Sequence, residues 1–332
     1  MSNVTQSLTY PITDPPAGYM DNAKVCSFLV NVACDMCQQW LQQGQPSPDS
    51  FHWVPNDPCP YTSQYNLNDF NFNPNALNGA SNSIIWSTFQ YKNQTYREPF
   101  GFIAMTAGGG AFYLVFRGSQ TNVDFDLDGE DPQVPYPEGP PDALVEEGFA
   151  AVFAGCSDAI GQALLQLSIP WDGDTRRAFQ YPFFITGHSL GSALATLSVP
   201  LMAPYQAKGM QCNQASPRVG NPAFANFIDS FADKGFPTYR LVNTADLVPK
   251  LPPPEVLVNG QKYSYQHVGT EVDFTAAYPT EKDKHSPCCS YSYALFNPTS
   301  PVNPNISQCV ATLEPSEAPP GERTSASPVG SV

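Results

Sequence analysis

The sequence predicts an α/β protein with a mostly parallel central sheet that is flanked by helices. Apolar segments typical of buried strands alternate along the chain with segments of helical periodicity, and this alternation favours a parallel sheet. Two of the strands run straight into the polar loops 216–224 and 243–254, as expected where the carboxyl ends of strands carry reactive groups. The third observation is a strand, a tight turn and a helix around Gly187-His188-Ser189-Leu190-Gly191.

The turn at Ser189 is predicted because an apolar, aromatic and β-branched run ends at a glycine, just before an Ala/Leu-rich helix. A serine at the apex of so tight a turn has strained backbone and an exposed Oγ. Side chains two residues before and after it would clash, which explains the glycines at Gly187 and Gly191. Leu190 is at the N-terminus of the helix, and its backbone N–H is expected to point where an oxyanion would form. The structural alternative is that Ser189 only caps the helix.

The chain is expected to form one domain over residues 21–298. Residues 1–20 are polar and contain prolines, which predicts an extended arm. From Thr299 the chain is rich in Pro, Ser and Glu with little to bury, so 299–332 is predicted to be a disordered tail. The expected elements are, in order, a helix from Asp21 to Gly44, a loop-rich connection over 45–81, strands at 83–91, 100–106 and 111–116, a helix at 144–167, the strand, turn and helix at 181–197, strands at 210–215, 239–242 and 263–274, and a loop at 283–289.

The composition excludes several classes of function. Only 14% of the residues are charged, and 15 Lys and Arg against 30 Asp and Glu give a net charge of -15. That balance repels phosphate backbones and anionic headgroups, so we expect no nucleic-acid partner and no electrostatic membrane docking. A neutral, apolar substrate fits better. No apolar run of about 18 residues occurs, and the N-terminus has neither a basic start nor an apolar stretch, so a soluble protein without transmembrane segment or secretory signal is expected.

The nine cysteines are not arranged as a metal site. Cys34 and Cys37 lie within the helical pattern, where core packing is the favoured role, and no second such pair completes a four-ligand zinc site. The neighbours Cys288 and Cys289 would not bind one metal ion comfortably.

The glycines 108–110 are predicted to form a hairpin turn and not a phosphate-binding loop, because no phosphate-loop pattern follows them. We therefore expect neither a metal nor a cofactor.

A serine hydroxyl is a poor nucleophile until an imidazole takes its proton and an acid orients that imidazole. The four histidines are His52, His188, His267 and His285. His188 adjoins Ser189 and is expected to pack beside the turn, because adjacent side chains diverge. His52 precedes the nucleophile, against the chain order Ser, Asp or Glu, His. His285 lies in a charged, proline-flanked loop and is the favoured base, whereas His267 lies within an expected strand and is the alternative.

The acid is predicted to be Asp246, which directly follows a strand and lies between Ser189 and His285 in the chain. Prolines stiffen the loop that contains it. Asp273 and Asp283 are the alternatives for this role, and a turn-capping aspartate is the structural reading of Asp246.

The second oxyanion donor is expected in the loop after a central strand that precedes the nucleophile. Arg117-Gly118-Ser119 follows the expected strand 111–116 and fits this place. The Ser119 backbone N–H would face the Leu190 N–H across the substrate carbonyl. Loss of one such donor typically costs about 10²–10³ in rate.

Five motifs occur in a recognisable order along the chain. They are VFRGS at 115–119, EEGF at 146–149, GHSLG at 187–191, SPRVGNPAFANF at 216–227 and NTADLVPKLP at 243–252. Together they resemble the class 3 lipases, the fungal-lipase-like α/β-hydrolases, over roughly residues 21–298. The resemblance implies a nucleophile elbow with Ser189 as nucleophile, Asp246 as acid and His285 as base. It further implies an oxyanion hole of Ser119 and Leu190, and a non-catalytic role for His267.

The sequence departs from the family pattern near the expected lid. Asn122-Val123 stands where Asn-Trp is usual, and Glu146 stands where a His is common. Apolar and acidic residues alternate with period two over 123–128, and several prolines follow, which disfavours an amphipathic lid helix. We therefore hypothesise weak interfacial activation. Rates on tributyrin across its solubility limit test this, and a sharp jump at emulsion formation contradicts it.

The sequence thus predicts a serine carboxylic-ester hydrolase, in the first place a triacylglycerol or acylglycerol lipase that forms an acyl-enzyme on Ser189. Its partner is a neutral ester or lipid substrate, met in solution or at a lipid–water interface. A phospholipase A1 or a feruloyl-type esterase with the same triad is the enzymatic alternative, and aromatic pocket walls would favour the latter. A binding module that keeps the fold without turnover is the alternative from another class, and labelling by a fluorophosphonate distinguishes it.

Overall fold

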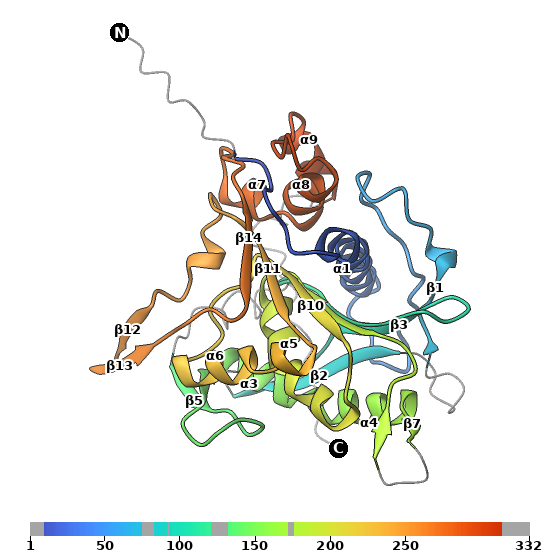
Figure 1. The fold of residues 1–332 in the computed structure, drawn as a ribbon. Coiled ribbons are helices and arrows are strands. Elements are labelled where there is room, and N and C mark those ends of the chain that lie inside the picture. The colour runs from blue at the N-terminus through green and yellow to red at the C-terminus, as the bar shows by residue number, and fades with distance from the viewer. Residues whose placement is uncertain (1–9, 75–82, 92, 121–131, 172–175, 314–332) are drawn as a thin grey trace.

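A computed structural model describes residues 10–74, 83–91, 93–120, 132–171 and 176–313 (Figure 1). Its centre is an eight-stranded sheet with the order β1-β3-β4-β9-β10-β11-β14, in which β2 also pairs with β3. The strands are β1 (Phe70–Asn71), β2 (Ile84–Tyr91), β3 (Gln94–Thr106), β4 (Phe112–Phe116), β9 (Phe183–Gly187), β10 (Gly209–Gln214), β11 (Thr238–Asn243) and β14 (Thr270–Phe274).

The part of the sheet from β4 to β14 is parallel throughout, whereas β1, β2 and β3 pair in antiparallel fashion. The prediction of an α/β fold with a mostly parallel central sheet is confirmed. Because parallel strands end at one edge, the loops after β4, β9 and β11 meet there. These loops contain Ser119, Ser189 and Asp246.

Helices cover both faces of the sheet, as expected (Figure 1). One face packs against α1 (Tyr19–Gln42) together with the C-terminal helices α8 (Tyr293–Phe296) and α9 (Ile306–Leu313). The other face packs against α3 (Glu147–Ala154), α4 (Ser157–Leu167), α5 (Leu190–Ser198) and α6 (Pro222–Asp229). β4 is buried on both sides: Phe112, Leu114 and Phe116 face one core, and Tyr113 and Val115 face the other.

The smaller elements lie at the margins of these layers. Three antiparallel strand pairs are formed by β5 (Gln133–Pro135) with β6 (Leu144–Glu146), β7 (Ile169–Pro170) with β8 (Arg177–Ala178) and β12 (Glu255–Val258) with β13 (Gln261–Ser264). Short helical turns are η1 (Leu67–Asp69), η3 (Val199–Tyr205), η4 (Ala232–Lys234) and η5 (Val248–Lys250). No single helix in the described ranges is long and apolar enough to cross a membrane; α3 and α4 meet that test only as a pair bent by 51°.

The continuous helix predicted over 144–167 is wrong. Residues 144–146 form β6, and the helical part breaks between α3 and α4 at Gly155. At this point the chain lies against β2, because a Cβ on Gly155 would lie 2.3 Å from the Thr88 carbonyl oxygen. The packing of Gly155 against β2 therefore ends α3, although the apolar periodicity of the sequence continues past this residue.

The single strand predicted over 263–274 is also wrong. The chain forms β13 and β14 with a connection between them, and His267 lies in that connection. The loop predicted at 283–289 is instead the short helix α7 (Glu281–His285), followed by a π-helical turn, η6 (Pro287–Ser292). Thr280 caps the N-terminus of α7 by accepting a hydrogen bond from the Asp283 N–H. His285 is the last residue of this capped helix, so its backbone lies in helical structure and not in a loop.

The prediction of a disordered tail from Thr299 is wrong for the residues up to Leu313. Residues 306–313 form α9, which buries Ile306 and Val310, and a disulfide joins Cys289 to Cys309. A second disulfide joins Cys59 to Cys288, so the sulfur atoms of 288, 289 and 309 that gather here are all engaged in disulfides. Residues 314–332 lie outside the described part of the chain. Of the predicted arm 1–20, residues 10–20 are described. Tyr10 bridges to Thr275 and the Ile12 N–H donates to the Pro298 carbonyl oxygen, whereas Tyr19 and Met20 are not part of an arm but begin α1.

Candidate active site

The loop between β9 and α5 forms a sharp turn with Ser189 at its apex. Ser189 has φ 56° and ψ -128°, a strained conformation for a residue with a side chain. A Cβ on Gly187 would lie 2.2 Å from the Gly191 carbonyl oxygen, and a Cβ on Gly191 would lie 2.3 Å from the Arg117 carbonyl oxygen. Both glycines are therefore required by close backbone approach, as the sequence predicted. The Ser189 N–H donates to the Gln214 carbonyl oxygen, which fastens the turn to β10.

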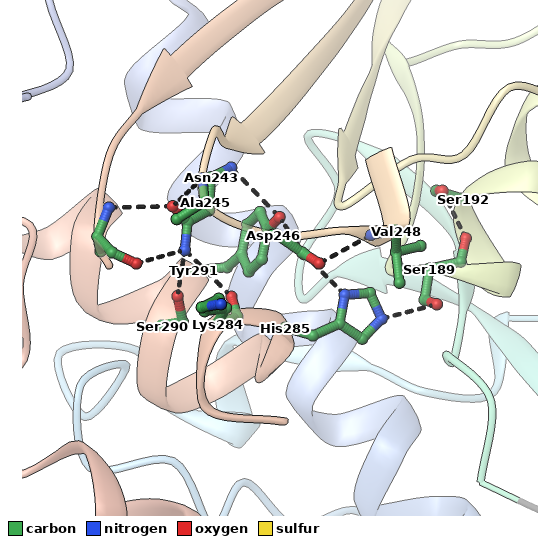
Figure 2. Close-up of polar contacts among 11 residues, drawn as sticks. Ser189, Ser192, Asn243, Ala245, Asp246, Val248, Lys284, His285, Ser290 and Tyr291 are labelled. Carbon is green, nitrogen blue, oxygen red and sulfur yellow. Dashed lines mark hydrogen bonds and ion pairs between the residues drawn. The ribbon is translucent and has the colours of Figure 1, made fainter. Parts of the chain in front are cut away.

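The ring of His285 bridges two other side chains (Figure 2). Its Nε2 lies 2.9 Å from Ser189 Oγ, and its Nδ1 lies 2.8 Å from Asp246 Oδ2. Ser189 comes from the β9–α5 turn, Asp246 from the loop after β11, and His285 from the last residue of α7. The structure thus brings together the three residues named from the sequence. Asp246, and neither Asp273 nor Asp283, is the carboxylate that contacts the imidazole.

Asp246 is 1% exposed and accepts three hydrogen bonds. The Val248 N–H donates to Oδ1, while His285 and the Tyr291 hydroxyl both donate to Oδ2, the latter over 2.7 Å. Burial opposes ionisation, but the hydrogen bonds and the charge of His285 outweigh it and hold the pKa of Asp246 below its ordinary value. Burial and the neighbouring carboxylate raise the pKa of Tyr291 well above its ordinary value, so its hydroxyl remains a donor.

His188 packs beside the turn, as expected from its position next to Ser189. Its ring lies 4.5 Å from the ring of His285, measured between centroids, and contacts Tyr291 edge-on. Burial, and then the charge of His285, hold the pKa of His188 well below its ordinary value. A neutral, buried imidazole therefore supports one face of the His285 ring.

Asn243, the last residue of β11, ties three segments to one another beside the site (Figure 2). Its Nδ2 donates to the carbonyl oxygens of Ala276 and Lys284, and its Oδ1 accepts from the Ala245 and Ala276 N–H groups. This side chain fixes the end of α7, and hence the His285 backbone, to the strand that leads to Asp246. Sequence reasoning missed Asn243 and Tyr291, because their roles depend on contacts between distant segments.

The other candidate histidines lie elsewhere. The His267 Nε2 lies 2.7 Å from the Pro249 carbonyl oxygen, and burial together with Arg240 and Arg218 lowers the pKa of His267 to about 3. His52 is exposed in the loop-rich connection. Neither histidine contacts Ser189 within the described hydrogen bonds.

A cavity of about 710 Å³ opens onto Ser189 and His285. Ser119, the predicted second oxyanion donor, lines this cavity, and Leu190 begins α5, where the first N–H groups have no acceptor within the helix. Polar side chains of α1, namely Asp35, Gln38 and Gln42, line it as well. The expected lid residues 122–128 lie outside the described residues.

Glu146, the second departure from the family pattern, has a local structural role. Its carboxylate accepts hydrogen bonds from the Gly148 and Phe149 N–H groups at the start of α3, and the side chain is fully buried. Glu146 is therefore the N-cap of α3.

A family model described as Lipase (class 3) matches residues 113–256, which include the Ser189 turn and Asp246. This part of the chain therefore resembles the class 3 lipases. The lipase of Rhizomucor miehei is 31% identical over 225 residues, which are 64% of this chain and 54% of that protein. The secreted mono- and diacylglycerol lipase A of Penicillium camembertii is 29% identical over 169 residues, half of each chain. The chain thus spans about half the length of these two curated relatives.

Solved structures of fungal lipases share the fold. The Rhizomucor miehei lipase propeptide complex superposes with a TM-score of 0.52 and 22% identity, over 81% of this chain and 72% of that one. A lipase from Rhizopus microsporus var. chinensis superposes with a TM-score of 0.50 and 20% identity, over 82% and 84% of the two chains. At this identity the likeness is one of fold, and the α/β-hydrolase architecture expected from the sequence is confirmed.

Proposed function

We propose that this chain is a serine carboxylic-ester hydrolase that acts on acylglycerols. The observation that carries the proposal is the His285 ring, which lies within hydrogen-bond distance of both Ser189 Oγ and the buried carboxylate of Asp246. The resemblance of residues 113–256 to class 3 lipases supports the same reaction. The name of the Penicillium relative, a mono- and diacylglycerol lipase, supports the substrate class.

In the proposed reaction Ser189 Oγ attacks the ester carbonyl carbon while His285 Nε2 takes the hydroxyl proton. Asp246 accepts the Nδ1–H of His285, which fixes the tautomer and stabilises the imidazolium that forms. The carbonyl oxygen becomes an oxyanion that accepts hydrogen bonds from the Leu190 and Ser119 N–H groups. The tetrahedral intermediate then expels the alcohol, which receives the proton from His285. Water, activated by the same imidazole, hydrolyses the acyl-enzyme and releases the fatty acid.

The lining of the cavity favours acylglycerols over aromatic esters. No Phe, Tyr or Trp occurs among the described lining residues, so the aromatic walls expected for a feruloyl-type esterase find no support there. The amide and carboxylate groups of Asp35, Gln38 and Gln42 lie along one wall. Such groups suit esters whose alcohol part carries free hydroxyls, as in mono- and diacylglycerols.

A panel of esters assayed with the full chain tests the proposal. We expect hydrolysis of tributyrin and dioctanoylglycerol at rates well above those for phosphatidylcholine and methyl ferulate. Ser189→Ala should lower turnover by about 10⁶, the scale seen when a catalytic serine is removed. Ser198→Ala is the matched control, because this buried serine at the other end of α5 donates to the Leu194 carbonyl oxygen and does not line the cavity among the described residues. Turnover by Ser189→Ala above about 1% of wild type would contradict the assignment of the nucleophile.

A further inference from the structure

Arg117 is a fully buried arginine at the start of the loop that contains Ser119. Its Nη2 forms an ion pair with Glu98 Oε2 at 2.9 Å, its Nε donates to the Pro99 carbonyl oxygen at 2.9 Å, and its guanidinium lies 4.2 Å from the centroid of the Phe100 ring. All three of these partners belong to β3. The guanidinium is therefore held from the β3 side of β4 by charge, a hydrogen bond and stacking.

The guanidinium also contacts the backbone of the next residue. Arg117 Nη1 donates to the Gly118 carbonyl oxygen at 3.0 Å. That oxygen and the Ser119 N–H belong to one peptide unit. In a planar trans peptide the C=O and the N–H point in opposite directions. A guanidinium that holds the carbonyl on the β3 side therefore directs the Ser119 N–H away from β3.

The nucleophile lies on that opposite side. β4 is flanked by β3 on one side and by β9 on the other, and Ser189 follows β9. Gly118 packs directly on the turn: a Cβ added to it would lie 2.9 Å from His188 Nδ1 and 3.4 Å from Ser189 Cβ. The Ser119 peptide thus sits beside the serine with its direction set by Arg117.

A second contact holds the loop one residue after Ser119. Gln38 of α1 donates to Gln120 Oε1 at 2.8 Å. The loop is thereby fixed on both sides of Ser119, by β3 through Arg117 and by α1 through Gln120.

We propose that Arg117, held by Glu98, is a positioning residue for the oxyanion hole, which keeps the Ser119 N–H directed at the carbonyl oxygen of the bound ester. The inference rests on the ester hydrolysis proposed for this chain. A buried ion pair adds little net stability, because desolvation of both charges offsets their attraction. A role in orienting a catalytic peptide gives this pair a function that burial of apolar residues would not supply.

Arg117→Lys tests the proposal, because lysine keeps a positive charge near Glu98 but cannot contact Glu98, Pro99 and Gly118 together. We expect kcat on p-nitrophenyl butyrate to fall about 10- to 100-fold with KM changed less than about threefold, since the oxyanion exists only in the transition state. Butaneboronic acid forms a tetrahedral adduct with the serine, and its inhibition constant should rise in proportion to the loss of kcat/KM. A substitution that only disturbs the fold would not raise the inhibition constant of the boronate in proportion to the loss of kcat/KM.

Arg240→Lys is the matched control. Arg240 is also buried, pairs with Glu271 and donates to the Val268 carbonyl oxygen, but it belongs to β11 and contacts no part of the Ser119 loop among the described hydrogen bonds. The Arg240→Lys variant should have a lower unfolding temperature, while its kcat and its affinity for the boronate stay within about twofold of wild type. If Arg117→Lys does not fold, Glu98→Asp replaces it, because the shortened carboxylate draws the guanidinium off the Gly118 carbonyl.

Two results would overturn the proposal. One is a folded Arg117→Lys or Glu98→Asp variant with kcat within about twofold of wild type. The other is a fall in kcat with unchanged boronate affinity. Both can occur while wild type hydrolyses esters and Ser189→Ala does not, so failure of this inference is distinct from failure of the proposed function.

Discussion

At the scale of single residues, the site depends on one imidazole with a neighbour at each ring nitrogen. His285 contacts Ser189 and Asp246, whereas the Nε2 of His267 lies beside a backbone carbonyl oxygen. His285→Ala should therefore lower turnover of tributyrin by about 10⁵–10⁶, and His267→Ala should keep it within about tenfold. Circular dichroism on both variants checks that each is folded. The reverse order of activities would assign the base to His267.

Tyr291 provides a pH-dependent test of the carboxylate. Its hydroxyl donates to Asp246, whose pKa is held below its ordinary value, so this hydrogen bond stabilises the folded state when Asp246 is ionised. Tyr291→Phe should cost about 1.5–3 kcal/mol of unfolding free energy at pH 7. The difference from wild type should shrink as the pH falls below about 4, where Asp246 takes up a proton in the unfolded chain and then in the folded one.

Urea unfolding of wild type and Tyr291→Phe at pH 7, 5 and 3 measures this difference. Tyr293→Phe is the matched control, because the Tyr293 ring packs edge-on against Tyr61 rather than against the site. A difference that is the same at all three pH values would show that Tyr291 does not act through the ionised carboxylate.

At the scale of elements, α7, η6 and α9 hold the histidine, and two disulfides hold these elements. The bond between Cys289 and Cys309 closes a loop with a sequence separation of 20 and fixes α9, whose Thr312 and Leu313 line the cavity. Cys289→Ser with Cys309→Ser should lower the unfolding free energy by about 3 kcal/mol, as expected for a loop of this length. Urea unfolding measures this loss. Cys156→Ser is the control for replacement of a buried thiol that forms no disulfide. An unchanged midpoint of urea unfolding in the double variant would contradict a stabilising role of the Cys289–Cys309 bond.

The elements also mark where sequence reasoning succeeds and fails. The strand, turn and helix around Ser189 follow from local signals: a β-branched run, two glycines and a small-residue helix. The break at Gly155, the helix α7 and the ordered α9 do not, because they depend on packing against β2 and on disulfides to distant cysteines. The Cys59–Cys288 bond, for example, spans a sequence separation of 229, and no local pattern pairs these cysteines.

At the scale of the whole molecule, the sheet brings distant parts of the chain to one edge. Ser119, Ser189 and Asp246 follow β4, β9 and β11, so chain order and parallel topology were enough to name them as candidates. The residues that support them were not predictable in this way. Glu98 comes from β3, Gln38 from α1 and Tyr291 from η6, and each acts through a contact that only the folded chain creates.

The central claim is that Ser189 is a nucleophile activated by His285, and covalent labelling tests it most directly. The full chain is treated with a fluorophosphonate probe, and the modified residue is located by mass spectrometry of the digested protein. We expect a single adduct on Ser189, which forms slowly in His285→Ala and is absent in Ser189→Ala. An adduct on another residue, or a folded wild-type chain that hydrolyses esters without any adduct on Ser189, would contradict the claim.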